Sequence, residues 1–430
     1  MNILITGANW HTRPRFRKGI RHFGHPNPLL DGISETTYQQ SEKAAVAQNM
    51  ETKRDLYLDI AKGICIILMV LGHSGCPEWM NRFMVLFRMP CFFFISGILL
   101  SDRYLTDVKG GICKKLKGYY QPYVKWTLIF LLLHNTFTYL HIYETSYTWQ
   151  ETAIKIVRTI IMTGGEQLLG GYWFLISLTW ASIGTIVILS ALRNKNKLTN
   201  VHIWEGVILA VLIASTEHLL PFKLPAQFGP QTFLALAFFM SGYIYRKSGL
   251  NKSKHLSQLY VLLLLIPAIV SVFADLSMST AEALSGGYFV VALSGIIGFI
   301  QLAKKLEHDK VVALFNYIGN KTLYILTFYF LAFKPISYIL IRLNGLPISD
   351  LSQFPVLKET SSWMWTIYTV AGICLPLLVW ELFHLPFLRF KKIKNKSNYY
   401  ESLSLLIWEL KNKVVKCLMN LTHTNHFRKV

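Results

Sequence analysis

The stretch RDLYLDIAKGICIILMVLGHS, residues 54–74, decides the fold class of this 430-residue chain. Its apolar run has about the 20 residues that an α-helix needs to cross the hydrocarbon core of a bilayer. A spanning segment must satisfy its own backbone hydrogen bonds, as either a helix or a strand of a closed barrel. Barrel strands alternate apolar and polar residues over about ten positions, which this run does not do. We therefore expect a transmembrane helix near residues 57–75.

The whole chain has the composition of a protein that crosses the membrane many times. Hydrophobic residues make up 52% and charged residues 16% of it, whereas an average soluble domain is about 25% charged. Ordinary soluble, disordered and collagen-like proteins are excluded. Similar apolar segments recur, and together they predict an all-α membrane bundle with about ten transmembrane helices. They lie near residues 57–75, 83–101, 119–140, 172–192, 201–219, 230–246, 257–276, 284–303, 319–341 and 364–387.

The basic residues indicate how the bundle is oriented. Lys and Arg number 44 against 23 Asp and Glu, an excess of +21. With both termini in the cytoplasm, the great majority of these basic residues fall in cytoplasmic segments, as the positive-inside rule requires. The charge excess is thus explained by membrane topology, and no nucleic-acid partner is expected. We expect a multi-pass protein of the cytoplasmic membrane.

The membrane region lies between two polar segments. Residues 1–56 are expected to be a poorly ordered cytoplasmic extension, residues 57–387 the transmembrane domain, and residues 388–430 a basic cytoplasmic tail. An amphipathic stretch near 403–415 in that tail either lies on anionic lipid or is simply solvated. The six cysteines are far apart and show neither metal-ligand spacing nor a disulfide framework, so no metal site is expected.

Ionisable side chains concentrate in the first two predicted helices. A charge within a span costs about 2.5–3.5 kcal/mol on insertion scales, so each such residue is a candidate for function. Asp59 and Lys62 share one helix face near the cytoplasmic end, and His73 lies about 16 Å further along the axis. A short turn joins the two helices, which places Arg88 at the depth of His73. We expect these two residues to line one outward-facing polar cavity, with Lys334 at a comparable depth.

Several of the charged groups also have a structural interpretation. Lys125 and Lys321 lie near span ends and are best explained by snorkelling. The basic run 114–117 is, on charge alone, an ordinary positive-inside signal. His134 faces an aromatic-rich stretch, where a backbone carbonyl is a sufficient partner. His73 is harder to explain in this way, because imidazole is the side chain best suited to proton transfer near neutral pH.

A series of motifs in this sequence resembles the membrane acyltransferase 3 family, especially its fucose 4-O-acetylase-like branch. In the stretch quoted above, Lys62 and His73 match the family's basic residue, ten intervening positions and histidine. The other matching motifs lie at residues 87–97, 114–123, 172–175 and 318–325, in the family's order. Together they cover residues 57–387, nearly the whole membrane region.

Three features depart from the family pattern. Arg88 and Tyr329 stand where the family usually has histidine, which suggests a different acceptor or a slower enzyme. Lysines also replace the usual arginines of the family's basic pair, and so give up bidentate recognition of phosphate for a point charge.

The resemblance implies transfer of an acetyl or other short acyl group from cytoplasmic acyl-CoA to a hydroxyl of an envelope polysaccharide or lipid-linked sugar. No bound cofactor is expected, and the donor enters as a substrate. The oligomeric state, the acceptor sugar and the acyl chain are not specified by the sequence. Direct transfer and a two-step route through an acyl-histidine both remain open.

The resemblance also assigns roles to particular residues. His73 is the predicted general base or nucleophile, and Arg88 the predicted stabiliser of the oxyanion. Asp59 is predicted to orient Lys62. The predicted donor-binding residues are Lys62, Lys114 and Lys117, and the predicted acceptor-binding residues are Trp173, Tyr329 and Lys334.

A proton-coupled transporter or a glycan flippase on an acyltransferase-like scaffold is the alternative. Many carriers show a repeat between their two halves, and this sequence shows no such symmetry. A flippase predicts large or basic regions on the glycan-facing side, yet the outer loops are short, apart from residues 141–171, and poor in Lys and Arg. Dependence on acyl-CoA separates the enzyme from both.

Overall fold

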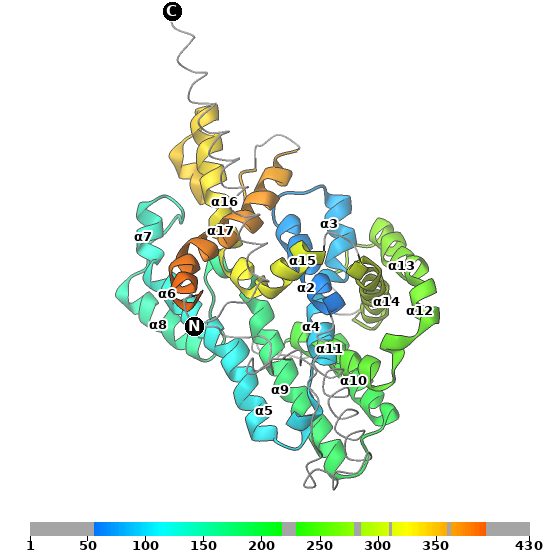
Figure 1. Ribbon diagram of the computed structural model, residues 1–430. Coiled ribbons are helices and arrows are strands. Elements are labelled where there is room, and N and C mark those ends of the chain that lie inside the picture. The colour runs from blue at the N-terminus through cyan, green and yellow to red at the C-terminus, as the bar shows by residue number, and fades with distance from the viewer. Residues whose placement is uncertain (1–55, 217–228, 279–284, 309–311, 359–362, 393–430) are drawn as a thin grey trace, which may run out of the picture. The chain divides into compact units, whose positions relative to one another are not determined.

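The computed structural model describes residues 56–216, 229–278, 285–308, 312–358 and 363–392, with side chains described up to residue 382. Every regular element within these residues is a helix, which confirms the predicted all-α fold class (Figure 1). Contacts divide the chain into two compact units, one ending at Pro376 and one beginning at Leu377. The predictions for the N-terminal extension and for the tail beyond residue 392 lie outside the described residues.

Helices of the first half follow the predicted spans closely. Two predicted spans are broken: the second at Leu86 and Phe87 into α3 and α4, and the third at Leu133 into α6 and α7. The elements are α2 (Leu56–Gly72), α3 (Glu78–Val85), α4 (Arg88–Ile98), η1 (Asp102–Leu105), α5 (Val108–Lys115), η2 (Leu116–Tyr120), α6 (Gln121–Leu132), α7 (His134–Tyr139), α8 (Trp149–Ile160), η3 (Gln167–Tyr172) and α9 (Trp173–Asn194).

Helices of the second half also begin and end near the predicted boundaries. They are α10 (Asn200–Thr216), α11 (Pro230–Lys247), α12 (Lys254–Gln258), α13 (Tyr260–Phe273), α14 (Ser285–Lys305), α15 (Val312–Asn320), α16 (Thr322–Asn344) and α17 (Met364–Lys392). Short 3-10 turns lie at Leu250–Lys252, Leu306–His308 and Ile348–Ser352. Among these helices, α2 packs against α4, α14, α15 and α16.

Some of these helices have the length and composition of membrane spans. Within the described residues, 5 helical segments are long and apolar enough to cross a bilayer: Glu78–Ile98, Gln167–Asn194, Ser285–Lys305, Thr322–Asn344 and Met364–Leu382. The shorter helices α10 and α13 are also apolar. These helices indicate a membrane protein. The total of about ten spans and the cytoplasmic placement of both termini stay predictions.

Glycines allow α4 and α11 to cross with their backbones in contact. A Cβ atom at Gly97 would meet the carbonyl oxygen of Phe239, and one at Gly242 would meet the carbonyl oxygen of Phe94. Neither position has room for a methyl group. Inside a bilayer, helices associate through close packing rather than through burial from water, and small residues permit that approach.

A second crossing of the same kind joins α2 to α15. A Cβ atom at Gly63 would meet the carbonyl oxygen of Phe315, and one at Gly319 would meet that of Asp59. Because Gly63 directly follows Lys62, this contact fixes the half of α2 that carries the Asp59 and Lys62 side chains.

The crossing of α4 and α11 can be tested by adding a single methyl group. We expect Gly242→Ala to lower the stability of the folded protein, because overpacking of a close contact costs about 1–3 kcal/mol. The measurement is the midpoint of thermal unfolding of the detergent-solubilised protein. Gly286→Ala is the matched control, because a Cβ atom there meets nothing within 4 Å. Equal midpoints for Gly242→Ala and the unchanged protein would contradict the close crossing.

Candidate functional site

His73 lies in the turn that follows α2, and hydrogen bonds hold this turn on both sides. The backbone N–H of His73 donates to the carbonyl of Val70 (3.1 Å). The hydroxyl of Ser74 donates to the carbonyl of Leu71 (2.7 Å) and accepts a hydrogen bond from Thr369 of α17 (2.9 Å). The turn is therefore attached both to the last residues of α2 and to α17.

The imidazole of His73 is half-buried against aromatic rings of α16. Its ring centroid is 5.2 Å from that of Phe330 and 5.8 Å from that of Tyr329. Within the described part of the chain, no side chain or carbonyl is hydrogen-bonded to its ring nitrogens. A partly exposed imidazole of this kind is able to accept a proton from a ligand hydroxyl.

Arg88, the first residue of α4, lies against the backbone of Gly72, which has no side chain. Its Nη1 atom donates to the carbonyl of Leu68 (3.2 Å) and to Oδ1 of Asn81 (3.0 Å). A Cβ atom at Gly72 would overlap the guanidinium group. Arg88 and His73 also interact electrostatically. The structure thus brings the predicted pair together. Arg88 begins α4 directly after the break at Leu86 and Phe87, which the sequence did not predict.

Polar atoms around Arg88 are buried without hydrogen-bond partners among the described residues. They are Nε of Arg88 and the hydroxyls of Tyr288 and Tyr329. Both tyrosines interact electrostatically with Arg88. Buried polar atoms without a partner are costly, and in folded proteins they often mark the place of a water molecule or a ligand. This group of donors fits a small polar ligand such as a carbonyl or hydroxyl oxygen. The sequence did not predict Tyr288 as a site residue, because it lies on α14, far from every motif.

The opposite half of α2 carries a buried ion pair next to a cavity. Nζ of Lys62 is 2.6 Å from Oδ1 of Asp59, which confirms the predicted contact between the two side chains. Lys62 also lines a cavity of about 50 Å³. Its other walls are largely apolar and include Ile66, Met69, Phe92, Phe174 and Leu326. Because Met69 precedes His73 by about one helical turn, the cavity follows α2 from Lys62 towards His73.

The basic run divides into exposed and inward-facing lysines. Lys114 and Lys117 are exposed. Lys115 is partly buried, and its Nζ atom donates a long hydrogen bond (3.5 Å) to the hydroxyl of Tyr119, which lines the cavity. The sequence reasoning did not select Lys115. The i,i+4 spacing of Lys115 and Tyr119 is the signal that could have found it.

The structure shows the environment of two predicted acceptor-binding residues, Lys334 and Trp173. Lys334 is buried, and its ammonium group donates to the carbonyls of Leu351 and Gln353, both at 2.8 Å. This charge therefore holds the loop that follows α16. Trp173 begins α9 and is half-exposed. The roles predicted for Trp173 and Lys334 in acceptor binding stay predictions.

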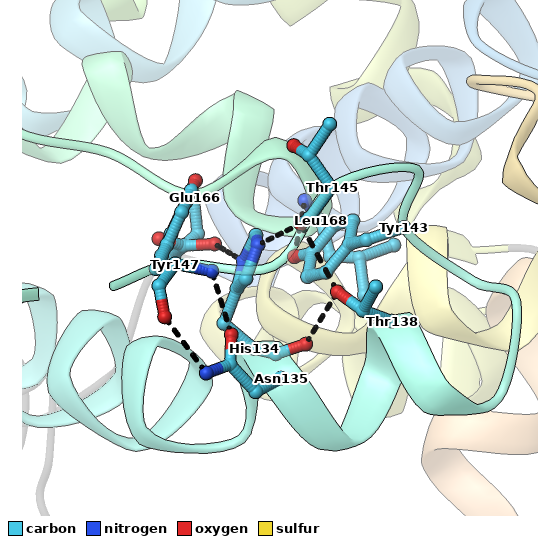
Figure 2. A network of polar contacts seen from close by, with 8 residues as sticks. All are labelled: His134, Asn135, Thr138, Tyr143, Thr145, Tyr147, Glu166 and Leu168. Carbon is cyan, nitrogen blue, oxygen red and sulfur yellow. Dashed lines mark hydrogen bonds and ion pairs between the residues drawn. The ribbon is translucent and has the colours of Figure 1, made fainter. Parts of the chain in front are cut away.

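A second polar cluster surrounds His134 (Figure 2). Its Nε2 atom is 2.9 Å from the carbonyl oxygen of Thr145, as the structural interpretation predicts. Its Nδ1 atom is 3.0 Å from a carboxylate oxygen of Glu166. The ring is stacked between those of Tyr143 and Tyr147, with centroid distances of 4.3 and 3.4 Å. The partnership with Glu166 was missed, because it joins residues far apart in the chain.

Comparison with known proteins assigns the family. A family model described as "Acyltransferase domain" matches residues 55–381. The chain belongs to this acyltransferase family. The match confirms the resemblance to the acyltransferase 3 family without singling out the fucose 4-O-acetylase-like branch. Together with the apolar helices, it identifies a membrane protein that carries an acyltransferase domain.

The similar curated proteins match shorter parts of the chain. Nodulation protein NolL of Mesorhizobium japonicum is 24% identical over 173 residues, which cover 37% of this chain and 41% of that protein. NolL of Sinorhizobium fredii is 25% identical over 179 residues, 39% and 44% of the two chains. The inner membrane protein YcfT of Escherichia coli is 33% identical over 81 residues, 14% and 22%. The chain thus spans less than half the length of these relatives. No solved structure matches it.

The contact between Gly72 and Arg88 makes a prediction about acyl transfer. The added methyl group of Gly72→Ala would displace the Arg88 guanidinium, which the sequence predicts to stabilise the oxyanion. We therefore expect this variant to slow transfer by about 100-fold. The double variant Gly72→Ala/Arg88→Ala should be no slower than Arg88→Ala alone, because both changes remove the same interaction. Initial rates in purified proteoliposomes measure this.

Gly165→Ala is the control for that experiment, because a Cβ atom at Gly165 meets nothing within 4 Å. It should transfer at the unchanged rate. A Gly72→Ala variant that is as fast as the unchanged protein would show that the position of Arg88 does not matter to the reaction.

Proposed function

We propose that this protein is an O-acyltransferase of the cytoplasmic membrane. It moves an acetyl or other short acyl group from acyl-CoA to a hydroxyl of an envelope polysaccharide or a lipid-linked sugar. One observation carries the proposal. His73 and Arg88 lie together at one end of α2, and the cavity beside Lys62 lies along the same helix towards its other end. Donor binding and transfer would then occur along one helix.

Two features support the proposed acyl-CoA site: the positive charge of the lysines and the apolar walls of the cavity. Acyl-CoA has a polyanionic nucleotide end and an uncharged pantetheine arm that carries the thioester. Lys62, Lys114 and Lys117 would hold the phosphates, with Lys115 beside them, bonded to the Tyr119 hydroxyl at the cavity wall. The apolar residues from Ile66 to Met69 would receive the arm and direct the thioester towards His73.

The chemistry follows from the groups at the other end. An imidazole nitrogen of His73 accepts the proton of the acceptor hydroxyl as that oxygen attacks the thioester carbonyl. The guanidinium of Arg88 and the hydroxyl of Tyr329 stabilise the oxyanion. When the tetrahedral intermediate collapses, the C–S bond breaks, the ester forms, and the CoA thiolate takes the proton from His73. In the two-step route, His73 itself carries the acyl group before the hydroxyl attacks.

The first test of this function is a transfer assay with His73 removed. Proteoliposomes are given radiolabelled acetyl-CoA and an envelope glycan fraction, and label in the glycan is followed with time. We expect His73→Ala to lower the rate by about 100-fold or more, since general acid–base groups contribute about 10²–10⁴. A carrier or flippase would show no transfer of label from acetyl-CoA.

The matched control is His202→Ala, which removes another half-buried histidine on a different helix, α10. It should keep the unchanged rate, and both variants must give the same yield of monodisperse protein in detergent. Full activity of His73→Ala would refute the proposed base. A well-folded unchanged protein without any transfer would refute the acyl-CoA donor.

Donor binding is tested separately through the exposed lysines. We expect Lys114→Gln/Lys117→Gln to raise KM for acyl-CoA by about tenfold or more while kcat changes little, because a hydrogen bond to a charged group contributes about 1.5–3 kcal/mol. Lys109→Gln, an exposed lysine of α5 outside the predicted phosphate contacts, is the control. The rise in KM should shrink at high salt, because salt screens exposed charges. An unchanged KM would remove these lysines from the donor site.

A further inference from the structure

The helix α8 exposes a continuous apolar face that the acyltransferase site does not use. At about 100° per residue, six apolar side chains of α8 and its C-cap residue fall within one sector of about 140°: Trp149, Ala153, Ile154, Val157, Ile160 and the C-cap Ile161. The five larger ones are between 50% and 90% exposed. Gln150 is the single polar residue within this sector. Contiguous exposed apolar surface of this kind marks a contact with a partner or a membrane.

The other sides of α8 show that the apolar face is not simply part of an unfolded or loose segment. Thr159, nearly opposite, is buried and faces the bundle. Between the buried and apolar sides lies a polar strip with Glu151, Lys155 and Arg158. Hydrogen bonds from the backbone and hydroxyl of Thr148 begin the helix with a capping box and hold the pKa of the Glu151 carboxyl below its ordinary value.

The cluster around His134 holds the N-terminal end of α8 in place (Figure 2). The side-chain amide of Asn135 donates to the carbonyl of Tyr147 (2.9 Å) and accepts from its N–H (2.8 Å). Tyr147 immediately precedes the Thr148 cap and is stacked on His134. Glu166, which follows α8, is bonded to the same histidine. The segments before and after α8 therefore both converge on the first turn of α7.

Tyrosines of η2 and α6 hold the C-terminal end. The hydroxyl of Tyr120 donates to the carbonyl of Ile160 (2.8 Å), and that of Tyr123 donates to the carbonyl of Gly164 (2.6 Å). With both ends attached, α8 cannot rotate to bury its apolar face in the bundle. Its apolar sector must be covered from outside.

We propose that α8 lies flat in the membrane interface, with its apolar sector in the lipid of the leaflet predicted to face away from the cytoplasm. The helix is about 18 Å long, too short to cross a hydrocarbon core of about 30 Å. Trp149 at one end is a residue type that is enriched at the membrane interface. Arg158 borders the apolar sector beside Ile154, where its stem can lie on apolar surface while the guanidinium reaches lipid phosphates.

Spin labels attached along α8 distinguish lipid from the other possible surroundings. Cysteines are introduced one at a time at Ile154, Val157, Ile161 and Arg158, in a background where Cys76, Cys113, Cys374 and Cys417 are replaced by serine. The labelled protein is reconstituted in vesicles of phosphatidylethanolamine and phosphatidylglycerol. Collision rates are then measured with oxygen, which concentrates in lipid, and with a water-soluble nickel chelate.

We expect the ratio of oxygen to nickel collisions to be several times higher at Ile154, Val157 and Ile161 than at Arg158. Nickel collisions at the three apolar positions as frequent as at Arg158 would overturn the proposal, because the apolar sector would then lie no deeper in lipid than the polar border of the helix. Low accessibility to both reagents, with dipolar broadening between labels, would overturn it in favour of a contact between two copies of the chain. This readout does not involve acyl transfer, so it stands or falls separately from the proposed function.

Discussion

Close approach to the backbone of α2 is the constraint on which the rest of the site depends. Gly63 lets α15 touch α2 beside Lys62, and Gly72 lets the Arg88 guanidinium lie beside His73. Within a bilayer, no burial from water drives helices together, so contacts of this closeness supply the packing energy. Both ends of the proposed reaction path are therefore positioned by the absence of a side chain.

The buried charged side chains of the described residues differ in how completely they are hydrogen-bonded. This difference helps to distinguish structural from functional charges. Lys334 donates to two carbonyls, and Lys62 is paired with Asp59. Arg88 is only 5% exposed and keeps Nε without a partner, next to a Tyr329 hydroxyl in the same condition. Arg88 therefore keeps a buried donor that a ligand can use, whereas the ammonium groups of Lys62 and Lys334 are bonded within the protein.

Local pattern predicted what depends on local geometry. The helices α2 and α11, predicted near residues 57–75 and 230–246, followed from apolar run length, and the contact of Asp59 with Lys62 followed from helix periodicity. The nearness of His73 and Arg88 followed from the short turn between their helices. Sequence spacing could not predict the pairing of His134 with Glu166, since it depends on how a long loop returns to the bundle.

The cavity and the helix break before Arg88 show the same limit more sharply. The break between α3 and α4 lies at Leu86 and Phe87, inside the predicted span 83–101, and an apolar window of about 20 residues averages over so short an interruption. The cavity wall combines residues of α2, α4, η2, α9 and α16, and Lys62 is the one charged side chain among these described residues. Volume between helices is a property of packing, which a single sequence does not display.

If the proposed reaction is correct, the apolar wall between Lys62 and His73 also explains how the two substrates stay on opposite sides. The phosphates of the donor are charged, and moving them past Ile66 and Met69 would cost several kcal/mol for each charge left without a partner. The pantetheine arm and its acyl group carry no charge and meet no such barrier. The basic residues therefore hold the nucleotide at one end of α2, while the thioester alone reaches His73 and Arg88. Water is excluded from the path by the same apolar side chains, which favours attack by the bound hydroxyl over hydrolysis.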